Sequence, residues 1–284
     1  MRVLVTGAGG QLGAELVTAF SRPHHDLVAA RHADLDVTHR DAVAGAIGAL
    51  APDLVVHAAA WTAVDACESD PDRAWLVNAL GCRHVAEAAR RAGAHLVAVS
   101  TDYVFDGSKE GPYTEWDRPA PGCVYGRTKA AGEREVLEGH PGSAVIRTSW
   151  LSGAGGANIV RTVLRLADAP GPLAFVDDQR GCPTFAEDLA AKIYDLAVGR
   201  RPGIFHVTNQ GATTWYGFAR DILAAAGHDP ERVRPIRSDE LDPPRRAPRP
   251  ANSVLDNTVL RLAGEPLLPD YHEPLARLVR RLTS

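Results

Sequence analysis

The chain has 284 residues, of which 45% are hydrophobic and 23% charged, and its formal net charge is −4 at pH 7. This composition is typical of a folded globular protein, and the mild acidity argues against a protein that coats nucleic acid or an anionic membrane. No apolar run approaches the roughly 18 residues that a membrane-spanning helix requires. Residues 1–7 read as a strand rather than a signal peptide, the four cysteines lack CxxC spacing, and the 11 histidines show no metal-ligand spacing. We therefore expect a cytoplasmic protein with free thiols and no metal centre.

The first half of the chain alternates short β-branched runs with amphipathic segments, a pattern typical of a parallel sheet covered by helices. Thr38 and Asp70 are expected to cap helices, and Gly93 is expected to end one. Because parallel strands cross over right-handed, we predict a doubly wound α/β sheet of the Rossmann type. Strands are predicted at residues 2–6, 26–30, 53–57, 95–100 and 143–147, and helices at residues 11–21, 40–50, 72–92 and 124–138.

The second half differs in composition and has clusters of glycine, proline and arginine. It predicts helices at residues 159–168, 187–198, 215–226 and 274–282, and a strand at 203–207 that returns to the main sheet. We expect a dinucleotide-binding domain over residues 1–150 with a returning segment near 180–208. A smaller α/β substrate lobe is expected over residues 151–284, interleaved with the first domain.

A glycine-rich loop at residues 7–13 follows the first strand and opens the first helix. Gly7 permits a tight turn, Gly10 lets the backbone approach a pyrophosphate, and Gly13 lets the helix lie near the sheet. The helix N-terminus offers free N–H groups and the positive end of its dipole to phosphates. This context predicts a dinucleotide site.

The end of the second strand carries Arg31 where an acidic residue would favour NAD(H). A guanidinium there can pair with a 2′-phosphate, so NADPH is the favoured cofactor and NADH stays possible. Asp36 and Val37 suit the adenine edge. Small side chains at residues 58–60 suit the walls of a cofactor cleft.

Tyr125 and Lys129 are four residues apart on a predicted helix and therefore share one face. An ammonium group beside a phenol lowers the phenol pKa, which makes the tyrosine a usable proton donor near neutrality. Lys129 is one of only three lysines among 31 basic residues. The segment Ser100-Thr-Asp-Tyr103 ends the fourth strand, where sites form in open α/β sheets, so Thr101 can hold a substrate oxygen.

Two further groups are candidates for the substrate. Trp150 can stack on a sugar or base, with a core position as the alternative. Arg245, Arg246 and Arg249 can clamp a diphosphate, with a solvated basic loop as the alternative.

These residues carry a resemblance to the dTDP-4-dehydrorhamnose reductase family of extended short-chain dehydrogenases/reductases. The matching stretches run through nearly the whole chain. They are GAGGQLG (7–13), DLDVT (34–38), HAAAWTAVD (57–65), STDYVFDG (100–107), YGRTKAAGE (125–133), RTSW (147–150), GCPT (181–184) and RPANSVLDN (249–257).

The resemblance implies that Tyr125 is the proton donor, that Lys129 is its partner and anchors the cofactor ribose, and that Thr101 tunes the site. It implies sugar contacts from Thr101, Asp102 and Trp150, to which we add Tyr103 of the same motif. The cofactor site would be lined by Gly10, Gln11, Leu12, Asp36, Val37, Ala60, Trp61 and Thr62, together with Gly7, Gly13, Ala58 and Ala59 of the loops described above.

The expected reaction is transfer of hydride from NAD(P)H to C4 of a dTDP-linked 4-keto-6-deoxyhexose, with dTDP-4-dehydro-L-rhamnose as substrate. A dehydratase would need a second carboxylate after Asp102, where this chain has Tyr103. Residues 151–156 depart from the family pattern at the border of the expected sugar pocket, so another dTDP-4-keto deoxysugar, as in dihydrostreptose synthesis, stays open. A sugar-nucleotide epimerase and a non-catalytic NADP-binding regulatory subunit are further alternatives. Either a monomer or a homodimer is compatible with the sequence.

Overall fold

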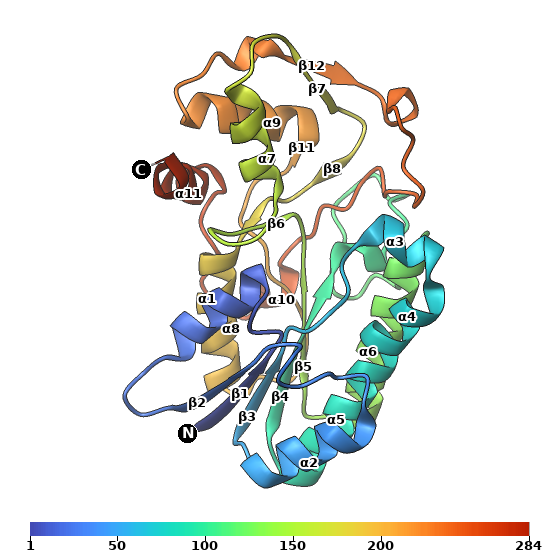
Figure 1. The fold of residues 1–284 in the computed structure, drawn as a ribbon, viewed down its shortest axis with the longest axis vertical. Coiled ribbons are helices and arrows are strands. Elements are labelled where there is room, and N and C mark those ends of the chain that lie inside the picture. The colour runs from blue at the N-terminus through green and yellow to red at the C-terminus, as the bar shows by residue number, and fades with distance from the viewer. Residues whose placement is uncertain (284) are drawn as a thin grey trace.

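The computed structural model describes residues 1–283 and has a central six-stranded sheet with helices on both faces (Figure 1). The strands run parallel in the order β10-β5-β4-β3-β1-β2, which is the doubly wound arrangement predicted from the sequence. The strands are β1 (Arg2–Thr6), β2 (Asp26–Ala30), β3 (Leu54–His57), β4 (His95–Thr101), β5 (Ala144–Thr148) and β10 (Gly203–His206).

Both faces of the sheet are buried, which explains why its strands read as almost continuous apolar runs. Successive residues of a strand point to opposite faces, so Val3 and Val5 join the core beneath α1 and α8, whereas Leu4 joins the core beneath α2 and α5. The covering helices are α1 (Gln11–Phe20) and α8 (Ala186–Val198) on one face, and α2 (Arg40–Leu50), α5 (Gly81–Ala92) and α6 (Val124–Gly139) on the other.

Most predicted elements are confirmed, and their ends agree within two residues. The predicted strand at 203–207 forms β10 and pairs with β5, so the chain does return to the main sheet. Asp70 caps α4 by accepting a hydrogen bond from the Arg73 amide, and Gly93 ends α5 with a φ of +71°.

The helix predicted over 72–92 is wrong as a single element. It divides into α4 (Pro71–Trp75), a π-helical segment (Leu76–Leu80) and α5. The wider π turn carries Asn78, whose side-chain amide accepts from the Trp61 N–H at 2.8 Å and donates to the Trp61 carbonyl at 3.1 Å. Apolar periodicity cannot predict this interruption because it is set by a tertiary hydrogen bond.

The predicted cap at Thr38 is also wrong, because α2 begins after His39 and no side chain among the described residues caps it. The Thr38 hydroxyl instead donates to Asp36 Oδ1 at 2.8 Å.

A second layer of structure sits above the carboxyl ends of the strands (Figure 1). Its core is formed by α7 (Ile159–Ala167), α9 (Trp215–Ala225) and α11 (His272–Thr283), with the parallel pair β7 (Leu173–Val176) and β12 (Val233–Ile236). The smaller elements are α3 (Val64–Ser69), β6 (Leu151–Ser152), β8 (Arg180–Gly181), β9 (Thr184–Phe185), β11 (Thr213–Thr214) and α10 (Thr258–Leu262). The division into domains at residue 150 stays a prediction. Over residues 1–283, no helix combines the length and apolarity needed to cross a membrane.

Candidate active site

The glycine-rich loop makes a close turn between β1 and α1. Gly7 has a φ of +71°, and a Cβ on Gly13 would stand 2.1 Å from the Gly7 carbonyl oxygen, so the turn admits only glycine at these two positions. Within the part of the chain that the structure describes, no side chain caps the N-terminus of α1 and its first turn holds no acidic residue. The bare helix end is therefore free to receive an anion.

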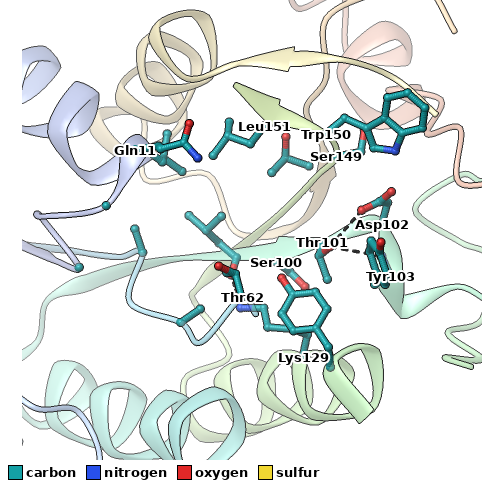
Figure 2. Close-up of a pocket in the computed structure, with 18 of the residues that line it drawn as sticks. Gln11, Thr62, Ser100, Thr101, Asp102, Tyr103, Lys129, Ser149, Trp150 and Leu151 are labelled. Carbon is teal, nitrogen blue, oxygen red and sulfur yellow. Dashed lines mark hydrogen bonds between the residues drawn. The ribbon is translucent and has the colours of Figure 1, made fainter. Parts of the chain in front are cut away.

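A cavity of about 340 Å³ extends from this loop across the carboxyl ends of β1, β3, β4 and β5 (Figure 2). It brings together most of the residues predicted for the cofactor and the reaction, which come from segments far apart in the sequence. The predicted residues that line it are Gly7, Gly10, Gln11, Leu12, Gly13, Ala58, Ala60, Thr62, Thr101, Asp102, Tyr103, Tyr125, Lys129 and Trp150.

Thr101 and Asp102 form the floor of this cavity where β4 ends (Figure 2). The Thr101 hydroxyl donates to Asp102 Oδ1 at 3.0 Å and accepts from the Tyr103 amide at 3.3 Å. Asp102 is 2% exposed, and its Oδ2 has no hydrogen-bond partner among residues 1–283. Burial raises the pKa of Asp102 to about 6.

Tyr125 and Lys129 lie on α6 and both are buried. Lys129 Nζ donates to the Val99 carbonyl oxygen at 2.7 Å. The predicted net lowering of the Tyr125 pKa is not seen in this structure: burial raises the pKa of the phenol, and the Thr101 hydroxyl acts in the lowering direction. Spacing alone predicts the shared helix face but cannot predict how deeply the phenol is buried. Tyr125 therefore keeps its proton near neutral pH.

A buried ion pair fixes α6 against the sheet. Arg147 of β5 donates to both carboxylate oxygens of Glu133, at 2.9 and 2.7 Å, and the Ser100 hydroxyl donates to the same carboxylate at 2.5 Å. Glu133 lies one turn beyond Lys129 on α6, while Ser100 immediately precedes Thr101 on β4. This network therefore sets where the helix residues stand relative to the end of β4.

Trp150 lines the cavity, but part of its indole surface packs against other residues. Its indole stacks on Trp215, with ring centroids 3.5 Å apart and an interplanar angle of 5°. Gly181 lies so close to the same indole that a Cβ there would be 2.5 Å from it. Trp150 also has a φ of +46°, a strained value for a non-glycine residue. One face of the ring is thus covered, and only its remaining surface is available to a ligand.

Several predicted site residues do not line this cavity. Arg31 lies at the outer side of the glycine loop, where a Cβ on Gly9 would be 3.6 Å from its Cγ. Ala59 packs against Gly7, and Val37 is buried beside Gly81. Asp36 instead accepts a hydrogen bond from the Thr38 hydroxyl, and the Trp61 amide donates to the Asn78 side chain. Arg249 also lies outside this cavity.

Arg249 lines a second cavity of about 410 Å³ that lies between β7, α7 and α9. Tyr103 borders both cavities, and Trp215 lies in the wall of the second one behind Trp150. Arg245 also lines the second cavity, whereas Arg246 does not and donates to Ser69 Oγ at 2.6 Å.

The Gln11 side chain makes hydrogen bonds to the segment after Trp150, which its position in the sequence does not suggest. Its side-chain oxygen accepts from the Gly153 amide at 3.1 Å and from Asn158 Nδ2 at 2.9 Å, and its side-chain nitrogen donates to the Ala157 carbonyl. The glycine-rich segment after Trp150 therefore packs on the phosphate loop. From the sequence, this segment is expected at the border of the sugar pocket, and its contact with Gln11 is not predicted.

A family model described as the RmlD substrate binding domain matches the chain over residues 1–284. The chain belongs to the dTDP-4-dehydrorhamnose reductase family. It is 46% identical over 273 residues, 94% of this chain and 89% of the relative, to a dTDP-4-dehydrorhamnose reductase of Streptomyces griseus.

Two further relatives are informative. A probable dTDP-4,6-dihydroxy-2-methyloxan-3-one 4-ketoreductase of Streptomyces antibioticus is 44% identical over 279 residues, 97% of this chain and 93% of its own length. The crystal structure of a dTDP-4-dehydrorhamnose reductase from Bacillus anthracis in complex with NADP superposes with a TM-score of 0.94 at 37% identity, covering 98% of each chain.

The residues of this family member fit a bound dinucleotide. The first cavity starts at the uncapped end of α1, where glycines at 7, 10 and 13 leave backbone rather than side chains, and ends at Tyr125 and Lys129. Among residues 1–283, no group of three or more histidine, cysteine, aspartate or glutamate side chains is placed to hold a metal ion.

Sequence reasoning missed several residues of the two cavities. Thr148 and Ser149 line the first cavity beside Trp150, and the RTSW motif that contains them was the available signal. Trp215 and Gln179 line the second cavity, and no motif singled them out. Asn78 was missed because it lies outside both cavities and acts through the backbone of Trp61.

Proposed function

We propose that this protein reduces the C4 keto group of dTDP-4-dehydro-L-rhamnose to give dTDP-L-rhamnose, with NADPH as the hydride donor. The observation that carries the proposal is that Tyr125, Lys129 and Thr101 meet in one cavity that begins at the phosphate loop. The names of the family's relatives agree with this reaction.

The bound cofactor supplies a hydride to C4, and the chain supplies the proton. Because burial keeps Tyr125 protonated, its phenol is suited to donate a proton to the O4 oxygen as negative charge develops there. The Thr101 hydroxyl has its hydrogen directed to Asp102, which leaves its oxygen to accept from Tyr125 or a sugar hydroxyl. Lys129 uses one N–H on the Val99 carbonyl and offers the others to the cofactor ribose.

The sugar would lie between Asp102, Tyr103 and the open surface of Trp150. The nucleotide would then extend past Tyr103 into the second cavity, where Trp215 can face the base and Arg245 and Arg249 can face the diphosphate. This places the reacting carbonyl at the carboxyl end of β4 and the larger part of the substrate in the upper layer.

The adenosine half of the cofactor would lie outside the first cavity, beyond the glycine loop. Arg31 stands beside this loop and is suited to pair with a 2′-phosphate, which favours NADPH and leaves NADH usable. Asp36, Val37, Ala59 and Trp61 would frame the adenine side. Asn78 would hold the Trp61 backbone in place.

A second candidate is reduction of another dTDP-4-keto deoxysugar, as in dihydrostreptose synthesis. The 44% identical relative from Streptomyces antibioticus, named as a 4-ketoreductase of a different sugar nucleotide, favours this alternative. Both candidates use the same proton donor and cofactor, so they differ only in the sugar that fits between Asp102 and Trp150. A regulatory subunit without catalysis fits less well, because the chain retains both Tyr125 and Lys129.

The test is NADPH oxidation, followed by absorbance, with dTDP-4-dehydro-L-rhamnose and separately with other dTDP-4-keto-6-deoxyhexoses. The proposal predicts the highest kcat/KM with the rhamnose precursor and dTDP-L-rhamnose as product. A higher kcat/KM with a different keto sugar would favour the second candidate. Consumption of sugar nucleotide without net NADPH loss would indicate an epimerase, and no consumption of either compound would contradict both reductase assignments.

A further inference from the structure

Asp65 joins two parts of the chain that are 184 residues apart in sequence. Its Oδ1 and Oδ2 accept two parallel hydrogen bonds from Arg249, each 2.7 Å long, and Oδ1 also accepts from the Ala247 amide at 3.0 Å. Arg245 Nη1 lies 3.7 Å from Oδ2. Such a two-bond arginine–carboxylate pair fixes orientation as well as distance.

The two ends of this contact belong to different cavities. Asp65 lies in α3, directly after Thr62 and Val64, which line the first cavity. Arg245 and Arg249 line the second cavity. Asp65 therefore links the segment that lines the first cavity to the two arginines that line the second cavity.

The two arginines near Asp65 differ in their exposure and in how closely they bind the carboxylate. The Arg249 side chain is only 13% exposed and spends both terminal nitrogens on Asp65, whereas the Arg245 side chain is 59% exposed and only approaches it. The hydrogen bond from Arg249 holds the pKa of Asp65 well below its ordinary value, so the carboxylate stays charged. One carboxylate thus faces two guanidinium groups, and net positive charge remains for an anion.

We propose that Asp65 is a positioning residue for the substrate, which fixes Arg249 and the segment carrying Arg245 at the wall of the second cavity before a nucleoside diphosphate arrives. This inference rests on the proposed function, because the ligand is the diphosphate of the nucleotide sugar. Arginine side chains and loops that are ordered in advance lose less conformational freedom on binding, so the ligand binds more tightly. Asp65 itself makes no contact with the reacting atoms.

The opposite physical effect is also testable. A carboxylate near a diphosphate-binding arginine can compete with the ligand, in which case its removal would strengthen binding. If Asp65 positions the arginines, its removal weakens binding of the diphosphate ligand. If Asp65 competes with the ligand, its removal strengthens binding, so the direction of the change in affinity decides between the two effects.

The experiment compares wild type with Asp65→Asn, which keeps the size of the side chain and removes its charge. Asp65→Glu restores the charge on a longer arm. Glu87→Gln is the matched control, because Glu87 pairs with Arg40 at 2.8 Å, is similarly exposed and lines neither cavity. Each full-length protein is titrated with dTDP and with NADPH by calorimetry, and steady-state kinetics are measured with the keto sugar nucleotide.

Positioning predicts that Asp65→Asn raises the Kd for dTDP and the KM for the sugar nucleotide about tenfold. The Kd for NADPH and kcat should stay within about twofold of wild type, a split that general destabilisation would not produce. Asp65→Glu should recover part of the loss, and Glu87→Gln should match wild type.

Unchanged or tighter dTDP binding by Asp65→Asn would overturn the inference, as would equal losses for dTDP and NADPH. If Asp65→Asn fails to fold, Asp65→Ser gives the same test, since serine removes the carboxylate that accepts the two bonds from Arg249 and leaves both arginines in place. Wild-type protein that binds NADPH but not dTDP would overturn the proposed function and this inference together. Wild-type binding of dTDP with no effect of either variant would overturn this inference alone.

Discussion

Thr101 and Asp102, adjacent at the end of β4, are joined by a hydrogen bond of 3.0 Å from the threonine hydroxyl to Asp102 Oδ1. The same hydroxyl oxygen accepts from the Tyr103 amide. With its proton on Asp102, the Thr101 oxygen is left to accept from Tyr125, whereas a Thr101 hydroxyl turned toward Tyr125 donates to the phenol oxygen and lowers the phenol pKa. Asp102 thus competes with Tyr125 for the proton of the Thr101 hydroxyl.

Asp102 should also make stability depend on pH. Its pKa in the folded protein is about 6, above the ordinary value of 3.8, so between these values the folded protein holds a proton that the unfolded chain has released. Stability from this group is therefore present below about pH 4 and is lost as pH rises to about 6, by about 3 kcal/mol in total. Urea unfolding of wild type and Asp102→Asn at pH 4.5 and 7 measures it. The variant should lose less stability over this interval, and parallel losses in the two proteins would contradict the assignment.

Arg31 should determine cofactor preference. Arg31→Ala removes the guanidinium proposed to face the 2′-phosphate, so we expect the KM for NADPH to rise about tenfold. The KM for NADH should change by less than about twofold, because NADH lacks this phosphate and serves as the internal control. Equal changes in the two KM values would place Arg31 outside the phosphate contact.

Trp215 should affect the nucleotide rather than the cofactor. Trp215→Ala removes the ring that stacks on Trp150 and lines the second cavity. We expect the Kd for dTDP to rise about tenfold, since base–aromatic stacking contributes about 1–3 kcal/mol, while NADPH binding stays unchanged. Trp116→Ala, at a 67% exposed tryptophan, is the control and should match wild type. Loss of NADPH affinity in Trp215→Ala would show that the stack supports the whole fold instead.

The buried pair between Glu133 and Arg147 should be a major stabilising contact of α6. Glu133→Ala leaves the Arg147 charge buried without its partner, which should lower the free energy of unfolding by about 3–5 kcal/mol. Glu135→Ala breaks the exposed pair with Arg83 on the same helix and should cost about 1 kcal/mol or less. Urea denaturation of both variants gives the comparison. Similar losses would mean that burial adds nothing to the Glu133 contact.

The sequence predicted the sheet and most helices because their signals are local. Strands buried on both faces appear as apolar runs, and the glycine loop, Asp70 and Gly93 mark turns and helix ends directly. The interruption at Asn78 is different, because Asn78 bonds to Trp61 in another segment of the fold. The predicted cap at Thr38 fails for a local reason, since the Thr38 hydroxyl bonds to Asp36 two residues before it. The short strands of the upper layer are two to four residues long, too short for a periodic pattern.

The residues of the first cavity could also be predicted, since their motifs lie at strand ends that a parallel sheet must bring together. The pKa values and ion pairs around these residues could not be predicted from the sequence. The pKa of Tyr125 depends on burial by segments distant in sequence, and the two-bond pair between Asp65 and Arg249 joins residues that no spacing rule relates. For Trp150 the sequence left ligand stacking and a core position open, because its stacking on Trp215 joins residues distant in the sequence.

The proton-donor role of Tyr125 is tested most directly by NADPH oxidation with dTDP-4-dehydro-L-rhamnose, measured for wild type and for Tyr125→Phe. Phenylalanine keeps the ring that lies edge-on to Tyr103, with centroids 5.5 Å apart, and removes only the hydroxyl. We expect kcat to fall by about 10²–10⁴-fold while NADPH and dTDP still bind as in wild type. A variant that retains wild-type kcat would show that the proton comes from another group and that Tyr125 is not the proton donor.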